Sequence, residues 1–137
     1  MLNFKLKVIK TIWVNIITVS IVVYIYVIIY GIFNSSEPIL KALLIGLYVG
    51  LIIIYGYGLL FWIYYLIITI IFSLLFINKN VRNLKLKLIT ESILVASPFI
   101  YGILEYNKWV FLIALVGFLI SQFLFRKKKI ENLLKSN

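Results

Sequence analysis

The sequence predicts an all-α integral membrane protein with five hydrophobic helical segments in a single transmembrane domain. The first reason is composition: 64% of the residues are hydrophobic, 13% are charged and the mean hydropathy is +1.13, whereas soluble domains average about 45–50% apolar and 25% charged residues. The second is that short lysine blocks separate uncharged runs long enough to cross a membrane. The third is that residues 42–77 contain no charged side chain. A straight helix of that length would measure roughly 54 Å, against a hydrocarbon core of about 30 Å.

The composition also argues against several kinds of functional site. Cysteine, histidine and aspartate are absent, so no disulfide framework can form and the usual metal ligands other than glutamate are missing. The net charge is +10, but the basic residues lie in short blocks between apolar runs, which is typical of membrane topology signals and not of a nucleic-acid-binding surface. No catalytic motif is present. We therefore expect no enzyme activity, no metal or cofactor, and no nucleic-acid partner.

The first predicted helix covers about residues 12–33. Three lysines between residues 1 and 10 precede an uncharged run that ends at Ser36, which is about enough for one crossing. The run is longer than the apolar core of a signal peptide and no small-x-small cleavage site follows it, so we expect an uncleaved helix. In the turn that follows, we expect Ser36 to cap the next helix, with Pro38 in its first turn.

The central run is too long for one straight crossing. To fit by tilt alone it would lean more than 50° from the membrane normal, outside the roughly 0 to 40° seen for transmembrane helices. We predict a break at residues 55–58 (Tyr-Gly-Tyr-Gly), between segments of about 39–54 and 58–77, because glycine weakens a helix and tyrosine suits the interface. Gly46 and Gly50 have a spacing that permits close helix packing. The alternative is an incidental pair in a glycine-tolerant membrane helix.

Two further helical segments follow a basic loop. The predicted ranges are the loop at 78–87, helical segments at about 88–106 and 109–125, and a basic tail at 126–137. Pro98 leaves the carbonyl of Leu94 without its helical donor, so we expect a kink there, with the Ser97 hydroxyl available to restore a bond. In the tail, an apolar stripe that includes Ile130 indicates a short helix.

Two topologies remain open. With five crossings the N-terminus is outside, and ten basic residues lie inside against four outside. With four crossings, segment 39–54 is re-entrant or interfacial, both termini are inside, and the ratio is twelve to two. The positive-inside rule favours four crossings, whereas burial of the apolar side chains between residues 42 and 55 favours five. Both place the loop and the tail in the cytoplasm. Lysine outnumbers arginine twelve to two, which favours the cytoplasmic membrane of a low-GC bacterium.

Two carboxylates are candidates for function because a charge near the membrane interior is unfavourable. They are Glu91 and Glu105, and each has a structural alternative to an ion or proton site. Glu91 lies in the first turns of its predicted helix, where Lys87 is placed to pair with it. Glu105 has Lys108 three residues further on.

Two further candidates are Pro98 and Trp62. A kink at Pro98 serves either gating or packing. Trp62, in a cluster with two tyrosines, either lines a pocket for a lipid or small apolar ligand or packs as an ordinary membrane aromatic. The other polar side chains of the spans are expected to form hydrogen bonds between helices; they are Asn15, Thr18, Thr69, Ser73, Ser121 and Gln122.

The tail begins with four cations, Arg126, Lys127, Lys128 and Lys129, which we expect to contact anionic lipid headgroups. The favoured function is that of an accessory, subunit or self-immunity protein acting through its membrane helices, with another membrane protein or a second copy of the chain as possible partner. The alternative is a small oligomeric transporter or holin-like pore. Such a pore would use Glu91, Glu105, Asn15 or Gln122.

Overall fold

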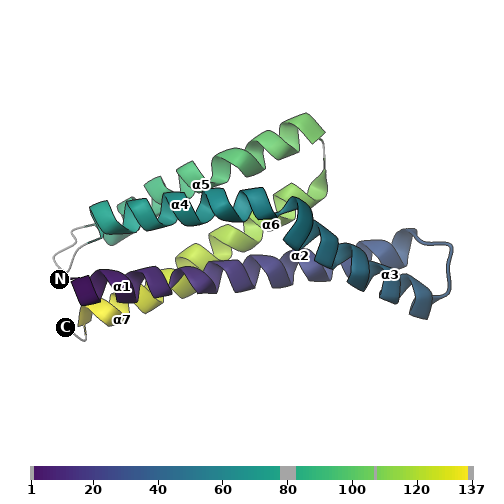
Figure 1. Cartoon of the computed structure of the whole chain (residues 1–137), viewed down its shortest axis with the longest axis horizontal. Helices are drawn as coiled ribbons and strands as arrows, with labels where there is room; N and C mark the ends of the chain where they lie inside the picture. Colours follow the sequence, from purple (N-terminus) through teal and green to yellow (C-terminus); the bar gives the residue numbers. More distant parts are fainter. Residues whose placement is uncertain (1, 78–82, 107, 136–137) are drawn as a thin grey trace.

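A computed structural model describes residues 2–77, 83–106 and 108–135, and this part of the chain is helical apart from short turns, with no strand (Figure 1). The elements are α1 (Leu2–Lys10), α2 (Ile12–Asn34), α3 (Ile39–Leu51), the π-helical segment η1 (Ile52–Tyr57), α4 (Leu59–Phe76), α5 (Leu84–Tyr106), α6 (Trp109–Ile120), the π-helical segment η2 (Ser121–Arg126) and α7 (Lys127–Lys135). The prediction of an all-α fold is confirmed.

Within the described residues, five helical stretches are long and apolar enough to cross a membrane. They are Asn3–Asn34, Ile39–Gly56, Leu59–Phe76, Leu84–Tyr106 and Trp109–Lys135. Their number matches the five hydrophobic segments predicted from the sequence. The first and last are longer than predicted, because α1 extends α2 and because η2 and α7 extend α6.

The second and third stretches run one after the other in the same direction, antiparallel to the first (Figure 1). Near one end, Gly31 of α2 lies against Gly46 of α3. Near the other end, the Lys5 ammonium of α1 donates to the carbonyl of Leu74 in α4 at 2.6 Å. Residues 39–76 therefore follow the whole length of α1 and α2 back to the N-terminal end.

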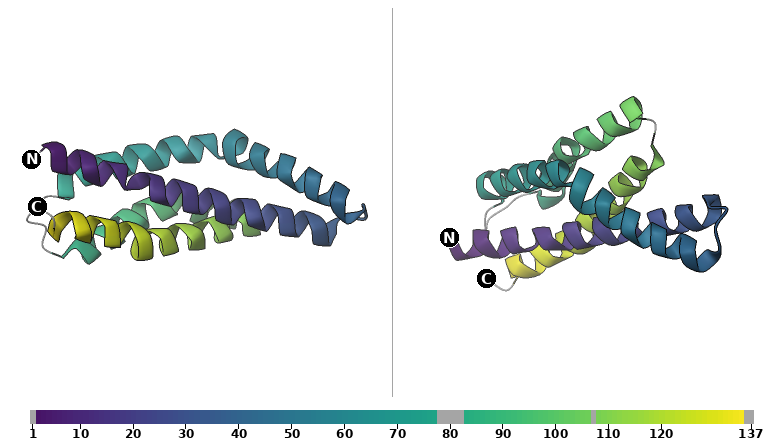
Figure 2. Two further views of the ribbon diagram at one scale, coloured as in Figure 1. Left: turned by 90° about the horizontal axis from the view of Figure 1, so that it is seen from below. Right: turned by 45° about the vertical axis from the view of Figure 1, so that its right-hand side comes forward.

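The break between these two stretches lies where the sequence predicts it. The helix becomes π-helical at Ile52, and α4 begins at Leu59. The N–H of Gly58 donates to the carbonyl of Ile53 at 2.8 Å, and a side chain at Gly58 would collide with the carbonyl oxygen of Ile54. Figure 2 shows that the chain bends here without reversing.

The last two stretches form a second hairpin. Helix α5 runs away from the N-terminal end, and α6, η2 and α7 return to it, so both ends of the chain lie together (Figures 1 and 2). An apolar cluster closes this end, made by Phe4, Val8, Ile77, Leu84, Leu88 and Ile130. The predicted apolar stripe of the tail is thus confirmed as a helical face, with Ile130 fully buried.

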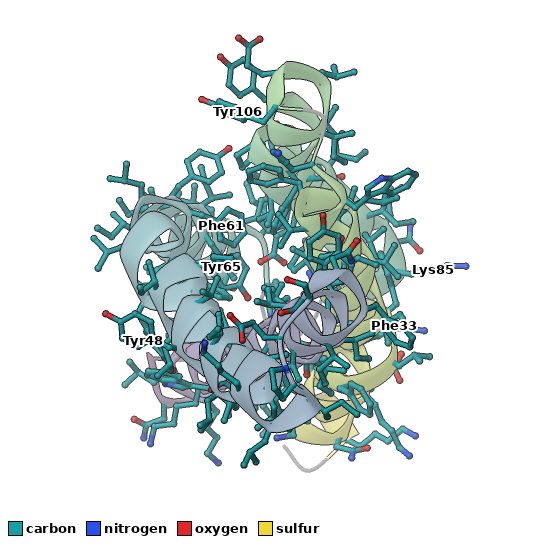
Figure 3. The ribbon with its side chains drawn as sticks, turned by 90° about the vertical axis from the view of Figure 1, so that its right-hand side faces the viewer. Phe33, Tyr48, Phe61, Tyr65, Lys85 and Tyr106 are labelled. Atoms are coloured by element: carbon teal, nitrogen blue, oxygen red, sulfur yellow. The ribbon has the colours of Figure 1, made fainter. Side chains whose placement is uncertain are left out.

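The hairpins α2–α3 and α5–α6 diverge from this shared end (Figure 1). Figure 3 looks from the hairpin end, with Phe33 and Tyr48 of one hairpin and Tyr106 of the other at the rim. Phe33 is 83% exposed and Tyr48 68%, whereas Tyr65 inside the molecule is 1% exposed. The outer surface is thus apolar over much of its area, as expected of helices that face lipid.

Two local predictions are corrected. Residues 84–87, predicted as loop, form the first turn of α5 because Leu84 packs into the apolar cluster; residues 78–82 of that loop lie outside the described part. Ser36 does not cap α3, which starts at Ile39 after Pro38 with no side-chain cap. The neighbouring Ser35 hydroxyl instead accepts from the N–H of Glu37 at 3.1 Å.

Candidate functional site

A cluster of buried polar side chains connected by hydrogen bonds lies where α2, α4, α5 and η2 meet. We call it the polar cluster. Each member is at most 5% exposed: Thr11, Asn15, Ser73, Glu91, Ser121, Gln122 and Arg126. Because these residues come from four of the five long helical stretches, hydrogen bonds among them connect helices that are distant in sequence.

An ion pair between Glu91 of α5 and Arg126 of η2 forms the centre of the polar cluster. Arg126 Nη1 lies 2.8 Å from Glu91 Oε1, and neither side chain has exposed surface. The guanidinium also donates from Nε to Thr11 Oγ1 at 3.2 Å, from Nη2 to Ser73 Oγ at 3.1 Å and from Nη1 to Gln122 Oε1 at 2.9 Å. A buried charge pair needs such additional partners, because both ions have lost their water.

The side-chain amides complete the polar cluster. Gln122 Nε2 donates to Glu91 Oε2 at 3.2 Å, so each carboxylate oxygen has a donor. Asn15 Nδ2 donates to Gln122 Oε1 at 2.6 Å, and Ser121 Oγ donates to Asn15 Oδ1 at 2.7 Å. With the bond from Arg126 to Thr11, three direct side-chain bonds thus connect the first long helical stretch to the last.

The π-helical geometry of η2 explains how three of its residues face the interior together. In a regular α-helix, Ser121 and Arg126 would be separated by about 140° around the axis, because residues five apart lie on different faces. A π-helical turn closes between residues five apart and brings them to one side. Ser121, Gln122 and Arg126 are all fully buried as a result.

Helix α4 presents two more buried hydroxyls beside the polar cluster. Tyr65, Thr69 and Ser73 follow one another at intervals of four residues, on one face of the helix. Ser73 accepts from Arg126, but the hydroxyls of Tyr65 and Thr69 have no hydrogen-bond partner among the described residues. The Tyr65 hydroxyl nevertheless lies near the Asn15 and Thr69 side chains, so it borders the polar cluster without completing a bond of normal geometry to it.

The two carboxylates predicted as candidates are not brought together. Glu91 is inside, but its partner is Arg126 and not Lys87, whose ammonium donates to the carbonyl of Phe76. Glu105 is exposed in the last turn of α5. Among the described ion pairs, none joins it to Lys108.

The four cations of the predicted lipid-contact run also separate. Arg126 is not at a headgroup position, because it turns inward to neutralise Glu91. Lys127 pairs with Glu131 at 3.4 Å, while Lys128 and Lys129 are exposed. One signal for the inward arginine was in the sequence: it opens a block otherwise made of lysine, and arginine suits buried ion pairs better than lysine does.

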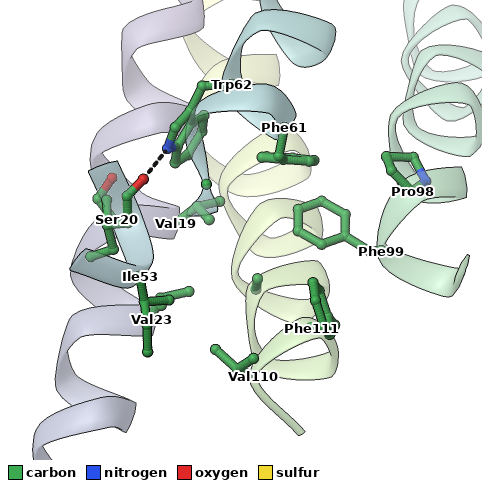
Figure 4. Close-up of a pocket in the computed structure, with 13 residues that line it drawn as sticks. Val19, Ser20, Val23, Ile53, Phe61, Trp62, Pro98, Phe99, Val110 and Phe111 are labelled. Atoms are coloured by element: carbon green, nitrogen blue, oxygen red, sulfur yellow. Dashed lines mark hydrogen bonds between the residues drawn. The ribbon is translucent and has the colours of Figure 1, made fainter. Parts of the chain in front are cut away.

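The other two predicted candidates, Trp62 and Pro98, line one cavity of about 200 Å³ (Figure 4). This cavity lies between the diverging hairpins, beside the helix break, and its walls are almost entirely aliphatic and aromatic. Trp62 Nε1 donates to the carbonyl of Ile54 at 3.2 Å, so the indole also satisfies a backbone acceptor at the break.

The backbone at Pro98 is repaired as predicted. Ser97 Oγ donates at 2.8 Å to the carbonyl of Leu94, which the proline leaves without its helical donor. The Tyr64 hydroxyl of α4 donates to the same oxygen at 3.0 Å. Helix α5 therefore continues through Pro98 and is hydrogen-bonded to α4 at this point.

No protein-family model matches this chain, and neither the curated proteins nor the solved structures include a match to it. Function must therefore be argued from the polar cluster and the cavity. In the part of the chain that the structure describes, no three acidic, histidine or cysteine side chains come together as a metal site would require. What the residues can do is hold four helices in register through a charge-balanced network and enclose an apolar group.

Proposed function

We propose that this chain is a small multi-pass membrane protein without catalytic activity that acts as an accessory protein, binding another membrane component through its helices. The observation that carries the proposal is the ion pair of Glu91 with Arg126. Because the two buried charges neutralise each other and each has further hydrogen-bond partners, the described interior offers no unpaired carboxylate or ammonium to a transported ion. Binding would then occur through the apolar outer surface and the cavity at Trp62.

The proposed topology has four crossings with both termini in the cytoplasm. Support comes from the path of residues 39–76, which follow α1 and α2 in one direction, and from the position of both chain ends at one end of the bundle (Figure 1). At about 1.5 Å per residue this path is roughly 57 Å long, about twice the hydrocarbon core. The hairpin α2–α3 would thus reach the outer interface, in agreement with the interfacial alternative predicted for segment 39–54.

The bilayer itself is a proposed partner at the cytoplasmic end. The exposed Lys128 and Lys129, together with the lysines of α1, would face anionic headgroups there. The strongly lysine-biased composition favours the cytoplasmic membrane of a low-GC bacterium as the location. With Arg126 directed inward, the lipid contact that we propose for the tail rests on its lysines alone.

A small oligomeric transporter or pore is the second candidate function. It is favoured by the unpaired hydroxyls of Tyr65 and Thr69 beside Glu91, since a proton or ion path needs polar groups with free bonding capacity. Of the residues predicted for such a path, Asn15, Glu91 and Gln122 converge. Glu105 does not.

Liposome reconstitution separates the two functions. Proton, cation and dye flux are measured for the purified protein, for Glu91→Gln and for Glu105→Gln as the matched carboxylate outside the polar cluster. For an accessory protein we expect no flux from the wild type, and stoichiometric co-purification of another membrane protein from gently solubilised membranes. Wild-type flux that Glu91→Gln abolishes and Glu105→Gln leaves intact would overturn the accessory proposal in favour of transport.

A further inference from the structure

A second cavity continues the one at Trp62. Its volume is about 420 Å³, and it lies between the hairpin α2–α3 and the start of α6. Ile53 and Val110 line both cavities, so the two adjoin at these side chains and together make a path from Trp62 outward between the diverging hairpins. We call it the fork groove.

The two ends of the fork groove differ in chemistry. Around Trp62 the wall is aliphatic and aromatic, with Val19, Phe61 and Phe99. At the outer end the wall includes the hydroxyl-bearing Tyr30 and Ser35 and one cation, Lys108. Lys108 is exposed and takes part in none of the described ion pairs. The fork groove therefore has the polarity of an amphiphile, with an apolar deep end and a positively charged mouth.

We propose that the fork groove binds one acyl chain of an anionic phospholipid, with the headgroup phosphate at Lys108. The inner cavity alone, at about 200 Å³, exceeds the volume of about 150 Å³ of an apolar protein cavity that takes up benzene. The outer cavity, at about 420 Å³, has about twice the volume of the inner one. The outer cavity reaches the surface at Trp109, which is 69% exposed. Phospholipid is the chain-bearing anion that a surrounding bilayer supplies, so this inference rests on the membrane location proposed above.

The tryptophans provide a direct readout of chain binding. Trp13 is 63% exposed, and Trp109, at the opening of the outer cavity, is 69% exposed. Phenylalanine at both positions leaves Trp62 as the only indole and keeps an aromatic ring at that opening. This variant is placed in phosphatidylcholine nanodiscs that contain increasing fractions of phosphatidylglycerol with brominated chains, which quench indoles on contact. We expect the fluorescence of Trp62 to be quenched saturably. Half-quenching should need a lower fraction of brominated phosphatidylglycerol among the lipids than of brominated phosphatidylcholine, and unbrominated phosphatidylglycerol should reverse it.

Two substitutions in the single-tryptophan protein, each with a control, test the charged mouth of the fork groove and the junction of its two cavities. Lys108→Gln should raise the half-quenching fraction about fivefold, because one cation beside an anionic lipid contributes about 1 kcal/mol. Lys41→Gln, at the same end of the bundle but paired with Glu37, should leave it unchanged. Val110→Phe should block the junction of the two cavities and abolish the saturable quenching. Val116→Phe should not, because Val116 of α6 is 46% exposed and lines neither cavity.

Three results would overturn the proposal. The first is equal quenching by both brominated lipids with no effect of Lys108→Gln, which would mean ordinary lipid contact. The second is a brominated free fatty acid that quenches at a lower fraction than phosphatidylglycerol does. The third is retained quenching in a Val110→Phe protein whose circular dichroism is native; if that variant does not fold, Lys108→Gln decides alone. None of these readouts depends on ion flux, so failure here is distinguishable from failure of the accessory function.

Discussion

Glu91 and Arg126, thirty-five positions apart, meet at 2.8 Å with no exposed surface on either side chain. Removing two charges from water is strongly unfavourable, and their attraction offsets this only when the remaining donors and acceptors also find partners. Here they do, through Thr11, Ser73 and Gln122. Because apolar helices in lipid have no hydrophobic force to fix their relative positions, we infer that the polar cluster sets the register of the bundle.

Breaking this ion pair should be strongly destabilising. Arg126→Gln leaves the Glu91 carboxylate buried without its cation, and we expect a loss of about 3–5 kcal/mol in the free energy of unfolding. Titration with a denaturing detergent, followed by circular dichroism, measures it. Glu131→Gln is the matched control, because its pair with Lys127 is partly exposed and should contribute at most about 1 kcal/mol. Equal effects of the two variants would contradict the assigned role.

A double-mutant cycle tests whether the two charges act as a unit. Glu91→Gln and Arg126→Gln each leave one buried charge without its partner, whereas the combined variant leaves two neutral amides. We expect the double variant to be less destabilised than the sum of the single variants by about 0.5–3 kcal/mol, the range found for residues in one network. Strict additivity would show that the two side chains contribute independently.

The hydroxyls along α4 offer a comparison one helical turn apart. Ser73 accepts from Arg126, whereas the Thr69 hydroxyl has no partner among the described residues. Ser73→Ala should lower stability by about 1–3 kcal/mol, because it leaves a charged donor unsatisfied. Thr69→Val keeps the shape and removes an unpaired buried hydroxyl, so it should be neutral or stabilising. The same detergent titration measures both, and a larger loss for Thr69→Val would mean that its hydroxyl is bonded.

Sequence reasoning located the elements because their causes are local. Uncharged length predicted the spans, the glycines at residues 55–58 predicted the break, and Pro98 predicted the Leu94 carbonyl that Ser97 now satisfies. It also predicted bonds between helices for Asn15, Ser73, Ser121 and Gln122, which the structure confirms, but it did not place Glu91 and Arg126 among them. The partner of Glu91 lies on another helix, and Arg126 reaches it only through a π-helical turn, so helical periodicity in the tail gave no sign of it.

A pocket at Trp62 was one of the two interpretations that the sequence offered, but its full lining was not predicted. Trp62 was singled out as a residue of a pocket or of ordinary aromatic packing, and Pro98 separately as a helix breaker. They line the same cavity because the hairpins diverge beside the break. That divergence is a property of how α2, α4, α5 and α6 pack, and no stretch of sequence encodes it alone.

Gly46 of α3 and Gly56 of η1 give a prediction about hairpin packing. A Cβ at Gly46 would lie 3.1 Å from the Cα of Ile28, which is backbone and cannot move aside. A Cβ at Gly56 would meet only the Ile52 side chain at 3.7 Å. Gly46→Leu should therefore separate α2 from α3, whereas Gly56→Leu should not. Cysteines introduced at Gly31 and Ala42 report the change, since their crosslinking should fall in the first variant and persist in the second.

The sharpest prediction about topology concerns the side of the membrane on which the N-terminus lies. Lys5 of α1 bonds to the C-terminal end of α4, and α1 packs on α7 through Phe4, Val8 and Ile130, so α1, the end of α4 and α7 lie at one end of the bundle. Four crossings place that end in the cytoplasm, with twelve cations against two outside. Reporter fusions at both termini and in the loop should all give a cytoplasmic signal, and a reporter inserted at residues 34–38 an external one. An external N-terminus beside a cytoplasmic C-terminus would require five crossings and would mean that α3 and α4 do not continue in one direction in the membrane.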